Sequence, residues 1–377
     1  MTAIGPTTLN IVVPALPQMA NRLASDVATI QLTVTVYLLA LASGQLVMGP
    51  LSDRFGRRPV MLAGLALTVV ASFAALATTS IAGLIVSRTV QAFGATAGIV
   101  IGRAVIRDLY DRNRAASMIG WVTMAMVVAP MIAPMIGGAL DTAFGWHAIV
   151  LFLGLFSAAI LAWTAIGLRE THATPSGEGF ARFFSNAATL LGDRAFIGYV
   201  LVAAFNSAMF FAFIGGAPHV VVTIMHRSSA EYGIWFAIIS VAYMAGNFAA
   251  GRWSAQYGVD TMIRRGVVIT AIGAAVGMAL ILLQPDGGPI VIATPQFIVA
   301  FASGFLLPNA IAGAVSVRPQ AAGTAAGITG FMQMGLGALV AQLVGQLIAS
   351  AATALPLELI VLALAACSMA SLALIRK

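Results

Sequence analysis

The sequence predicts an all-α membrane protein whose twelve transmembrane helices form two halves of six. Three observations lead to this fold class. The 377-residue chain is 60% hydrophobic and only 8% charged, whereas an ordinary soluble domain carries roughly 25% charged residues. Its apolar residues form long runs close to the ~20 residues that a helix needs to cross a bilayer. Its basic residues are concentrated in every second connection between those runs.

The twelve spans follow from the apolar runs and from the charged residues, glycines and prolines that interrupt them. The first run is short, and the others are long enough to cross a bilayer. We expect the first six spans near residues 3–20, 28–51, 59–79, 81–103, 116–140 and 146–168. We expect the other six near residues 196–222, 231–252, 265–284, 290–312, 320–348 and 355–374.

The basic residues give an independent test of the span count. Cytoplasmic connections of membrane proteins carry an excess of Lys and Arg. If the N-terminus is cytoplasmic, sixteen of the nineteen basic residues fall on the cytoplasmic side, and only Arg22, Arg88 and Arg227 fall elsewhere. An odd error in the count would destroy this asymmetry, so both termini are expected to be cytoplasmic.

The longest polar stretch separates the two halves. Residues 1–168 form the first half, residues 169–195 a cytoplasmic linker, and residues 196–377 the second half. The linker contains a predicted helix that is apolar on one face, as expected of a helix lying in the membrane interface. That face holds Phe183, Phe184, Ala187, Leu190 and Leu191. Two six-span halves are typical of transporters built from repeats, which share one site near the midplane.

An enzyme, a metal site and a nucleic-acid-binding protein are not expected. Neither a nucleophile–base pair nor a phosphate-binding loop is evident in the sequence. Cys367 is the only cysteine, so the chain forms no internal disulfide, and the four histidines lie in separate segments without metal-ligand spacing. The basic residues are dispersed between apolar runs rather than clustered for nucleic acid. No cofactor is expected, and the expected partners are a small-molecule substrate and the lipid bilayer.

Residues 49–58 form a polar connection between the second and third expected spans, with the sequence GPLSDRFGRR. Gly56 permits a tight reversal of the chain, and Pro59 suits the start of the next helix. Asp53 can accept hydrogen bonds from backbone amides or pair with Arg57. The alternative is a positively charged turn of the kind that any membrane protein can have.

This connection resembles the signature loop of the major facilitator superfamily, and its length and its place after the second span favour that interpretation over a plain charged turn. The resemblance implies a gating loop formed by Gly49, Asp53, Arg54, Gly56, Arg57 and Arg58. A weak echo of the loop runs from Gly246 to Arg252 in the second half.

Two further segments resemble motifs of the same superfamily. Arg88 and Gln91 lie in a run that resembles the span-four motif, in which an arginine lies within the membrane. Pro134, Gly137 and Gly138 match the span-five motif of its exporters, although the usual Gly-Pro is Ala-Pro here. The resemblance implies antiport, and therefore export rather than uptake.

Four runs narrow the resemblance. They are residues 14–17 (PALP), 31–36 (QLTVTV), 103–110 (RAVIRDLY) and 145–147 (GWH). Together they resemble the bicyclomycin/chloramphenicol-resistance (Bcr/CflA) branch of drug exporters, and the likeness extends over nearly the whole chain. The resemblance implies a multi-pass protein of the bacterial cytoplasmic membrane.

The sequence departs from that branch at two places. The branch carries an aspartate in span one, four residues before the proline that matches Pro14, and this chain has Asn10 there. The first span is also short, because Met1 precedes Asn10 by only nine residues. We therefore expect a truncated first helix, which fits either a misassigned start or a degraded copy.

Few ionisable groups are expected inside the membrane. A proton-coupled exporter needs such a group, because its charge can be gated by access to either side. All twelve Asp and Glu fall at or near span ends, with Asp141 and Glu358 among those on the external side. This pattern and Asn10 weaken the case for proton antiport through span one. Arg88 is the only charge clearly within a span. It either contacts substrate, or takes part in proton coupling by shifting the pKa of a neighbour, or donates structural hydrogen bonds to backbone carbonyls of another helix.

Polar residues within the expected spans are the candidates for a central cavity. Each of them can instead be a helix-packing residue. The candidates are Asn10, Arg88, Gln91, Asn206, Tyr243, Asn247 and Gln333.

The sequence therefore predicts a secondary active transporter that exports drugs or other small amphipathic molecules by alternating access with proton antiport. We expect it to act as a monomer. Two alternatives remain at this stage. One is a carrier for an anionic or neutral metabolite, suggested by Arg88 in the absence of a mid-span acid. The other is a non-transporting descendant of a carrier, suggested by the short first span.

Overall fold

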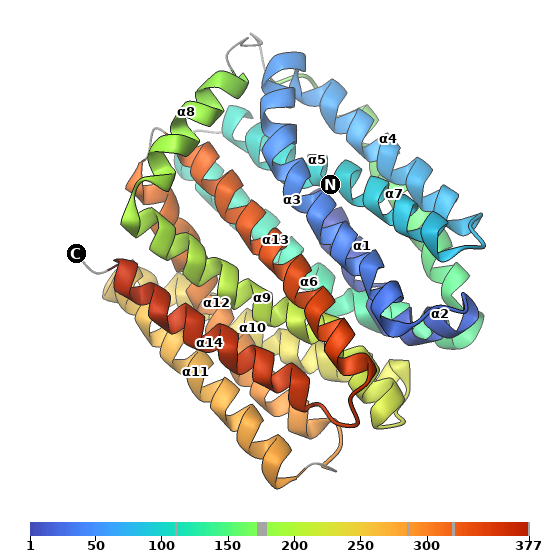
Figure 1. The fold of residues 1–377 in the computed structure, drawn as a ribbon. Helices are drawn as coiled ribbons and strands as arrows, with labels where there is room; N and C mark the ends of the chain where they lie inside the picture. Colours follow the sequence, from blue (N-terminus) through green and yellow to red (C-terminus); the bar gives the residue numbers. More distant parts are fainter. Residues whose placement is uncertain (110–111, 172–178, 285–286, 319–320, 376–377) are drawn as a thin grey trace.

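The computed structural model describes residues 1–109, 112–171, 179–284, 287–318 and 321–375, and within these ranges every regular element is helical. Figure 1 shows long helices packed side by side, with the first half (blue to cyan) beside the second (green to red). The first half contains α3 (Val27–Phe55), α4 (Arg57–Leu76), α5 (Ile81–Leu109), α6 (Arg112–Phe144) and α7 (Trp146–Gly167).

The first span is broken into three short pieces, although the sequence predicts one helix near residues 3–20. These are α1 (Ile4–Asn10), the 3₁₀ turn η1 (Val13–Ala15) and α2 (Leu16–Arg22). Pro14 and Pro17 explain the breaks, because proline has no amide hydrogen and is tolerated best in the first turn of a helix. Both occupy that position, Pro14 in η1 and Pro17 in α2.

The connecting helix α8 (Gly179–Leu191) leads into the second half. Its long helix α9 (Arg194–His219) continues into a short π-helical segment, η2 (Val220–Ile224). The remaining helices are α10 (Ser229–Tyr257), α11 (Val259–Leu283), α12 (Ile290–Val317), α13 (Ala322–Ala349) and α14 (Leu355–Ile375).

Twelve crossings account for these helices. Ten of the described helices are long and apolar enough to span a membrane. At 33 residues, α6 is long enough for an eleventh crossing, and the broken first span makes the twelfth. Side chains on the outer surface agree with this, because Trp163 and Ile166 of α7 are 81% and 88% exposed. Large apolar side chains in that position are expected to face lipid.

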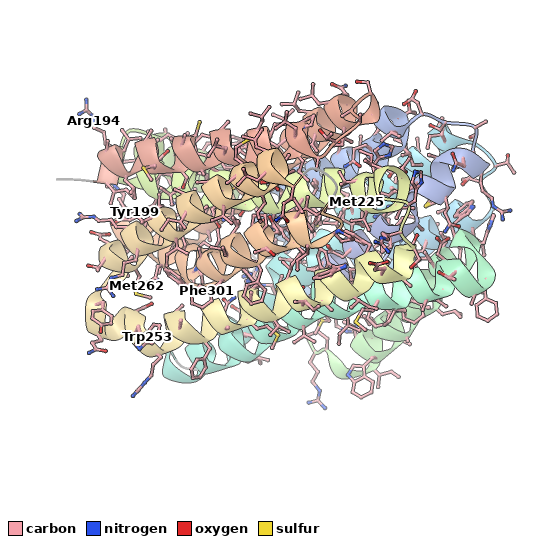
Figure 2. The ribbon with its side chains drawn as sticks, turned by 90° about the horizontal axis from the view of Figure 1, so that it is seen from below. Arg194, Tyr199, Met225, Trp253, Met262 and Phe301 are labelled. Carbon is pink, nitrogen blue, oxygen red and sulfur yellow. The ribbon has the colours of Figure 1, made fainter. Side chains whose placement is uncertain are left out.

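Each end of the bundle is called after a residue that lies there, Asp26 at one end and Gly56 at the other. The Asp26 end holds the loop before α3, where the Asp26 carboxylate accepts a hydrogen bond from the Thr29 amide at 2.6 Å. Hydrogen bonds from Thr29 keep the pKa of Asp26 below its ordinary value. The Gly56 end holds the turn between α3 and α4. In Figure 2, Arg194 and Trp253 lie toward the Gly56 end of the second half and Met225 lies toward the other end.

The turn at Gly56 has a counterpart in the second half. Gly56 separates α3 from α4 at φ +97°, and Gly258 separates α10 from α11 at φ +80°. Both angles lie in the left-handed region that glycine adopts readily. The weak echo of the loop in the second half is therefore followed by the same helix–glycine–helix turn. The glycine of that turn, Gly258, lies six residues after Arg252.

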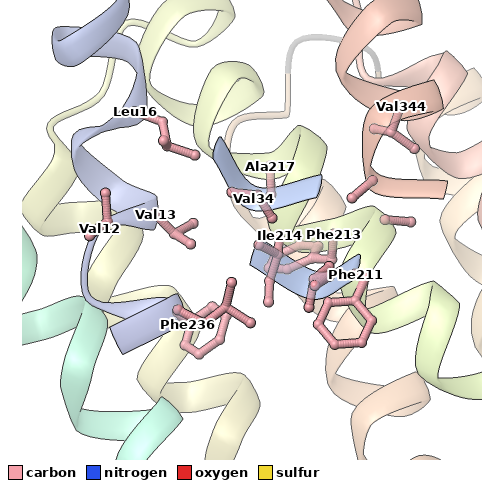
Figure 3. Packing of buried hydrophobic residues seen from close by; sticks show 14 of the residues in the cluster. Val12, Val13, Leu16, Val34, Phe211, Phe213, Ile214, Ala217, Phe236 and Val344 are labelled. Carbon is pink, nitrogen blue, oxygen red and sulfur yellow. The ribbon is translucent and has the colours of Figure 1, made fainter. Parts of the chain in front are cut away.

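The halves meet chiefly through two helix pairs, α3 with α13 and α6 with α10, and also through the first span. Figure 1 shows α13 lying alongside α3. Buried apolar residues join the halves in one cluster. Figure 3 shows that this cluster combines Val12, Val13 and Leu16 of the first span with Phe211, Phe213 and Ile214 of α9 and with Phe236 of α10. The core thus crosses the boundary between the halves.

Candidate functional site

The predicted gating loop is a network of charges at the Gly56 end. Arg57 Nη1 lies 2.5 Å from Asp53 Oδ1 and donates a hydrogen bond to Ser52 Oγ at 2.6 Å. Of the two roles that the sequence allows for Asp53, the structure has the ion pair with Arg57. Gly56 reverses the chain between the two residues, as its position in the sequence predicts.

Two acidic residues from distant segments complete this network. Arg57 Nε donates to Asp108 Oδ2 at 3.1 Å. Glu170 caps the start of α4, where its two carboxylate oxygens accept from the Arg57 and Arg58 amides at 2.9 and 3.1 Å. A Cβ on Gly56 would lie 2.6 Å from Glu170 Oε2, so the cap requires glycine there. The loop therefore ties the ends of α3, α4 and α5 to the segment that follows α7.

Sequence reasoning missed Asp108 and Glu170 as partners of the loop. Asp108 stands in the run 103–110, and Glu170 follows the sixth span, so both were visible as acids at the expected cytoplasmic ends. Of the predicted loop residues, Asp53, Gly56, Arg57 and Arg58 meet in the network, with Arg58 Nε donating to the Leu168 carbonyl at 2.9 Å. Arg54 is exposed and stacks over Phe55, and Gly49 lies near Val100.

Arg88 is the centre of a second polar cluster, inside the first half. Its Nη1 donates to Gln91 Oε1 at 2.6 Å, and Gln91 Nε2 donates to Ser72 Oγ at 2.6 Å. The guanidinium lies over the ring of Tyr37, 4.3 Å from its centroid, within the range of a cation–π contact. Tyr37 in turn donates to the Gly5 carbonyl of α1 at 3.0 Å.

This cluster links three long helices to the first span and is deeply buried. Arg88 is 4% exposed and Gln91 2%. Arg88 Nε has no hydrogen-bond partner, although it is buried. A buried arginine is costly without partners, so the ring face of Tyr37 and the Gln91 amide offset part of that cost. One buried donor of the cluster is left without a partner.

The Asn10 side chain forms a hydrogen bond within its own helix. Its Nδ2 donates to the Pro6 carbonyl of the same helix at 2.8 Å, and its buried Oδ1 has no partner. The next residue, Ile11, exposes its carbonyl to Gly137 of α6 so closely that no Cβ fits on that glycine. Asn10 therefore sits at the break in the first span, one residue before its contact with α6.

The polar candidates of the second half fall into separate groups. Asn206 Nδ2 lies 3.4 Å from Thr270 Oγ1, and Gln333 Oε1 accepts from Ser207 Oγ at 3.2 Å. Asn247 donates to the Tyr243 carbonyl at 2.9 Å. These contacts join α9 to α11 and α13, or lie within α10. A shared central cavity for all seven candidates stays a prediction.

The span-five motif lies where the first half meets both the first span and the second half. Gly137 faces the Ile11 carbonyl, and Gly138 faces Ser229 of α10, whose carbonyl oxygen would be 3.1 Å from a Cβ. The Pro134 carbonyl lies 3.2 Å from the position that a Cβ on Gly233 of α10 would take. Small residues thus let three backbones approach closely, as in other membrane helix pairs.

Two carboxylates near the Asp26 end are more buried than the sequence indicates. Asp141 and Glu358 stand near span ends, as expected, yet each is only 4% exposed. Neither oxygen of Asp141 has a hydrogen-bond partner, nor has Glu358 Oε2. Glu358 packs in the second half, with Oε2 so near Gly277 of α11 that no Cβ fits there. Asp141 lies on α6, four residues after Gly137.

Comparison with known protein families identifies the family to which this architecture belongs. Residues 1–342 match the family described as Major Facilitator Superfamily. The chain belongs to the major facilitator superfamily. Its members are transporters, so this protein is a multi-pass membrane transporter for small molecules rather than an enzyme, as the sequence predicts.

The relatives place this superfamily member in the bicyclomycin/chloramphenicol-resistance branch. The chain is 31% identical to the chloramphenicol resistance protein of Pseudomonas aeruginosa, over 83% of this chain and 72% of that protein. It is 26% identical to the bicyclomycin resistance protein homolog of Haemophilus influenzae, over 92% and 87% of the two chains. The resemblance read from the four sequence runs is confirmed.

A solved superfamily structure has the same fold. A bacterial homolog of the human lysosomal transporter Spinster, described as inward-facing and unoccupied, superimposes with a TM-score of 0.72. The superposition covers 99% of this chain and 93% of that one at 16% sequence identity. The two-half architecture predicted from the sequence is confirmed by this fold and by the family match.

Proposed function

We propose that this transporter exports drugs or other small amphipathic molecules across the bacterial cytoplasmic membrane by alternating access. The observation that carries the proposal is the set of contacts between the halves toward the Asp26 end. An exporter of this kind takes substrate from the cytoplasmic side while its external side is closed. The names of the two antibiotic-resistance relatives support drugs as the substrate class.

Contacts between α3 and α13 support closure at the Asp26 end. Thr35 Oγ1 lies 2.9 Å from Gln342 Oε1, and Gln342 Nε2 donates to the Ala28 carbonyl at 3.2 Å. One turn farther along α13, a Cβ on Gly345 would lie 2.7 Å from Gln31. These polar bridges between the halves lie in the first three turns of α3, beside Asp26.

The packing of α13 is different near its start, at the Gly56 end. A Cβ added to Gly323 or to Gly327 would meet nothing within 4 Å, whereas a Cβ on Gly330 would collide with Gln45 of α3. The glycine pair therefore faces open space there, although such spacing allows close helix approach elsewhere. Open space beside the first turns of α13 fits an inward-open state, and the similar solved structure is described as inward-facing.

The orientation of the chain follows from its basic residues. The Gly56 end carries most of them, so we place that end and both termini in the cytoplasm. The linker helix α8 supports this orientation, because Phe184 and Leu191 are 67% and 55% exposed while Leu190 is buried. Apolar side chains exposed on a connecting helix suit the membrane interface. We propose that the linker at residues 169–195, which contains α8, divides the chain into its two halves. We also propose that the transporter acts as a monomer.

The charged loop has a mechanical role in this proposal. Arg57 binds Asp53, Asp108 and the cap formed by Glu170, so the ends of four crossings move together. A first half that moves as one body can rock against the second. Gly49 and Arg54, which stand outside the network, are expected to contribute less.

A carrier for an anionic metabolite is the second candidate, and the free Nε of Arg88 favours it. A planar guanidinium with an unused donor suits a carboxylate or phosphate. Against this candidate, Arg88 is already engaged by Gln91 and Tyr37. Competition separates the two functions, because an anion carrier is inhibited by anions and a drug exporter by neutral or cationic drugs.

Transport by everted membrane vesicles tests the proposed function. Vesicles from cells that make the protein should accumulate labelled chloramphenicol when energised, and vesicles from matched cells without it should not. A panel of neutral, cationic and anionic drugs then defines the substrate class. Equal accumulation in the two kinds of vesicle across the whole panel would contradict export.

A further inference from the structure

The turn between α10 and α11 carries three exposed arginines, Arg252, Arg264 and Arg265. Among the residues that the structure describes, none of the three forms an ion pair. Asp260, the acid of this turn, accepts a hydrogen bond from Tyr199 Oη of α9 at 2.6 Å. The turn therefore presents more positive charge than its own carboxylate balances.

The matching turn of the first half is balanced differently. Gly56 ends α3 as Gly258 ends α10, but the arginine that follows Gly56 has acidic partners. Arg57 contacts Asp53 and Asp108. In the described part of the second half, the arginines after Gly258 lack such partners. An anion from outside the chain would serve there as Asp108 serves in the first half.

Arg265 is held by an aromatic ring and keeps its hydrogen-bond donors unused within the described chain. Its guanidinium lies over the ring of Tyr257, 4.3 Å from the ring centroid, and so joins the start of α11 to the end of α10. Stacking uses the face of the guanidinium, whereas its five N–H donors lie in the guanidinium plane. A planar fork of this kind matches the oxygens of a phosphate group.

Apolar side chains continue from Arg265 toward the middle of the bundle. Val268 and Ile272 stand three and seven residues after Arg265, so they share its face of α11, and they are 49% and 53% exposed. Trp253 lies one turn before Tyr257 on α10 and is 46% exposed. Large apolar side chains exposed on a spanning helix are expected to face lipid. These five residues together are called the α10–α11 corner.

The corner is supported by α12. Both α10 and α11 pack against α12. The three helices share a small buried cluster, formed by Ala249, Ala250, Met262, Ala302 and Phe305. In Figure 2, Trp253 and Met262 lie toward the Gly56 end of the second half, and Phe301 lies farther from that end. This shared core fixes the backbone that carries the corner.

We propose that the α10–α11 corner binds an anionic phospholipid, with the phosphate on Arg265 and the acyl chains along Val268 and Ile272. Trp and Tyr are enriched at headgroup level in membranes, which places Trp253 and Tyr257 beside the phosphate. A zwitterionic headgroup also carries a cation, which the arginines of the turn repel. A headgroup of net negative charge is therefore preferred.

This inference goes beyond the proposed function, because it depends neither on the substrate nor on the direction of transport. Its tests measure lipid binding and need no transported drug. A failure of drug export would therefore leave the lipid site to be judged on binding alone.

Native mass spectrometry of the full chain in detergent compares phosphatidylglycerol with phosphatidylcholine of identical acyl chains. One basic residue near a membrane surface changes the binding of anionic lipid by about fivefold. We expect the unmodified protein to prefer phosphatidylglycerol by at least that factor. Arg265→Gln should weaken phosphatidylglycerol binding by about fivefold and leave phosphatidylcholine binding unchanged. Arg54→Gln is the matched control, because Arg54 is an exposed arginine at the same end that also lies over an aromatic ring.

Equal affinity of the unmodified protein for the two lipids would overturn the proposal, as would unchanged phosphatidylglycerol binding in Arg265→Gln. An equal loss of binding in Arg54→Gln would also overturn it, because the basic end would then attract anionic lipid without a site. Glycerol 3-phosphate, which has a phosphate but no acyl chains, should not displace the lipid at the same concentration. Displacement would assign Arg265 to a soluble phosphate instead.

Cross-linking in nanodiscs locates the lipid in the unmodified protein, so it does not depend on the folding of a variant. Phosphatidylglycerol and phosphatidylcholine, each with a photoreactive group in one acyl chain, are compared by peptide mapping. Phosphatidylglycerol should label the segment around Val268 and Ile272 more strongly than phosphatidylcholine does. Equal labelling of that segment by the two lipids would contradict a site for anionic phospholipid.

Discussion

Arg57 lies four residues after Asp53 in the chain, and the two side chains form an ion pair of 2.5 Å across the reversal at Gly56. The pair is partly buried, with the Asp53 side chain 37% exposed and that of Arg57 9% exposed. Arg57 also reaches Asp108 on α5. Neutralising Asp53 removes the negative charge that attracts Arg57 and loosens the link between α3 and α4.

Asp53→Asn should therefore slow transport by about tenfold, equivalent to ~1.4 kcal/mol, while the protein still reaches the membrane. Arg54→Gln is the matched control, because Arg54 is exposed and contacts only the ring of Phe55 among the described interactions. Rates of drug transport, normalised to protein in the membrane, give the comparison. Unchanged rates in Asp53→Asn would reduce the loop to a topological turn.

Gly56→Ala should destabilise the protein. The backbone of Gly56, at φ +97° and ψ 154°, lies in a region essentially confined to glycine and costs another residue roughly 1–3 kcal/mol. The added Cβ would also press on the Glu170 carboxylate. The control is Gly251→Ala in α10, where a Cβ meets nothing within 4 Å. Thermal melting in detergent should show a lower midpoint for Gly56→Ala and an unchanged or higher midpoint for Gly251→Ala. Equal midpoints would mean that the turn relaxes without cost.

Gly137→Ala should prevent the first span from docking on α6, because the Cβ would collide with the Ile11 carbonyl. We expect loss of most transport activity with a smaller loss of folded protein. Gly335→Ala on α13, where a Cβ has open space, should retain activity. If the two variants transport drug equally well, the close contact at Gly137 has no role in closing the Asp26 end.

Arg88→Ala should lower substrate affinity or turnover more than it lowers folded yield. Arg88→Lys should restore activity only in part, because an ammonium group cannot reproduce the planar contacts with Gln91 and the Tyr37 ring. Binding affinity and yield measured on the same preparations separate the two roles. Parallel losses of yield and transport would identify Arg88 as a structural residue.

Asn10→Asp should strengthen the dependence of transport on a proton gradient and favour cationic substrates. The neutral amide cannot load a proton, whereas a buried carboxyl can. The local bond from Asn10 Nδ2 to the Pro6 carbonyl would be lost, so thermal stability should be measured together with transport. Proton coupling that is no stronger in Asn10→Asp than in the unmodified chain would show that this position lies outside the coupling pathway.

The sequence predicts most of the fold because hydropathy and charge record which segments face lipid. Gly56 and the Asp53–Arg57 pair could also be predicted, since both depend on neighbours close in the chain. Asp108 and Glu170 could not be assigned to the loop, because helix periodicity does not tell which helix ends meet. The two prolines that break the first span were visible, but their effect depends on how η1 packs against α6.

The burial of Asp141 could not be predicted from the sequence, for the same reason. Its place three residues before the end of α6 suggests a solvated helix end, which is the usual position of an acid. Its actual environment is set by Ile11 and α10, which close over that end. The seven cavity candidates are separated for the same reason, since Arg88 and Gln333 bond to partners within their own halves.

Distance measurements between spin labels test alternating access most directly. One pair of labels, at Arg54 and Gly323, spans the Gly56 end, and another, at Ala24 and Thr353, spans the Asp26 end. We predict that a transported drug lengthens the Asp26-end distance and shortens the Gly56-end distance. Distances at both ends that stay unchanged, or that change in the same direction, would contradict an exporter whose two halves rock about a central site.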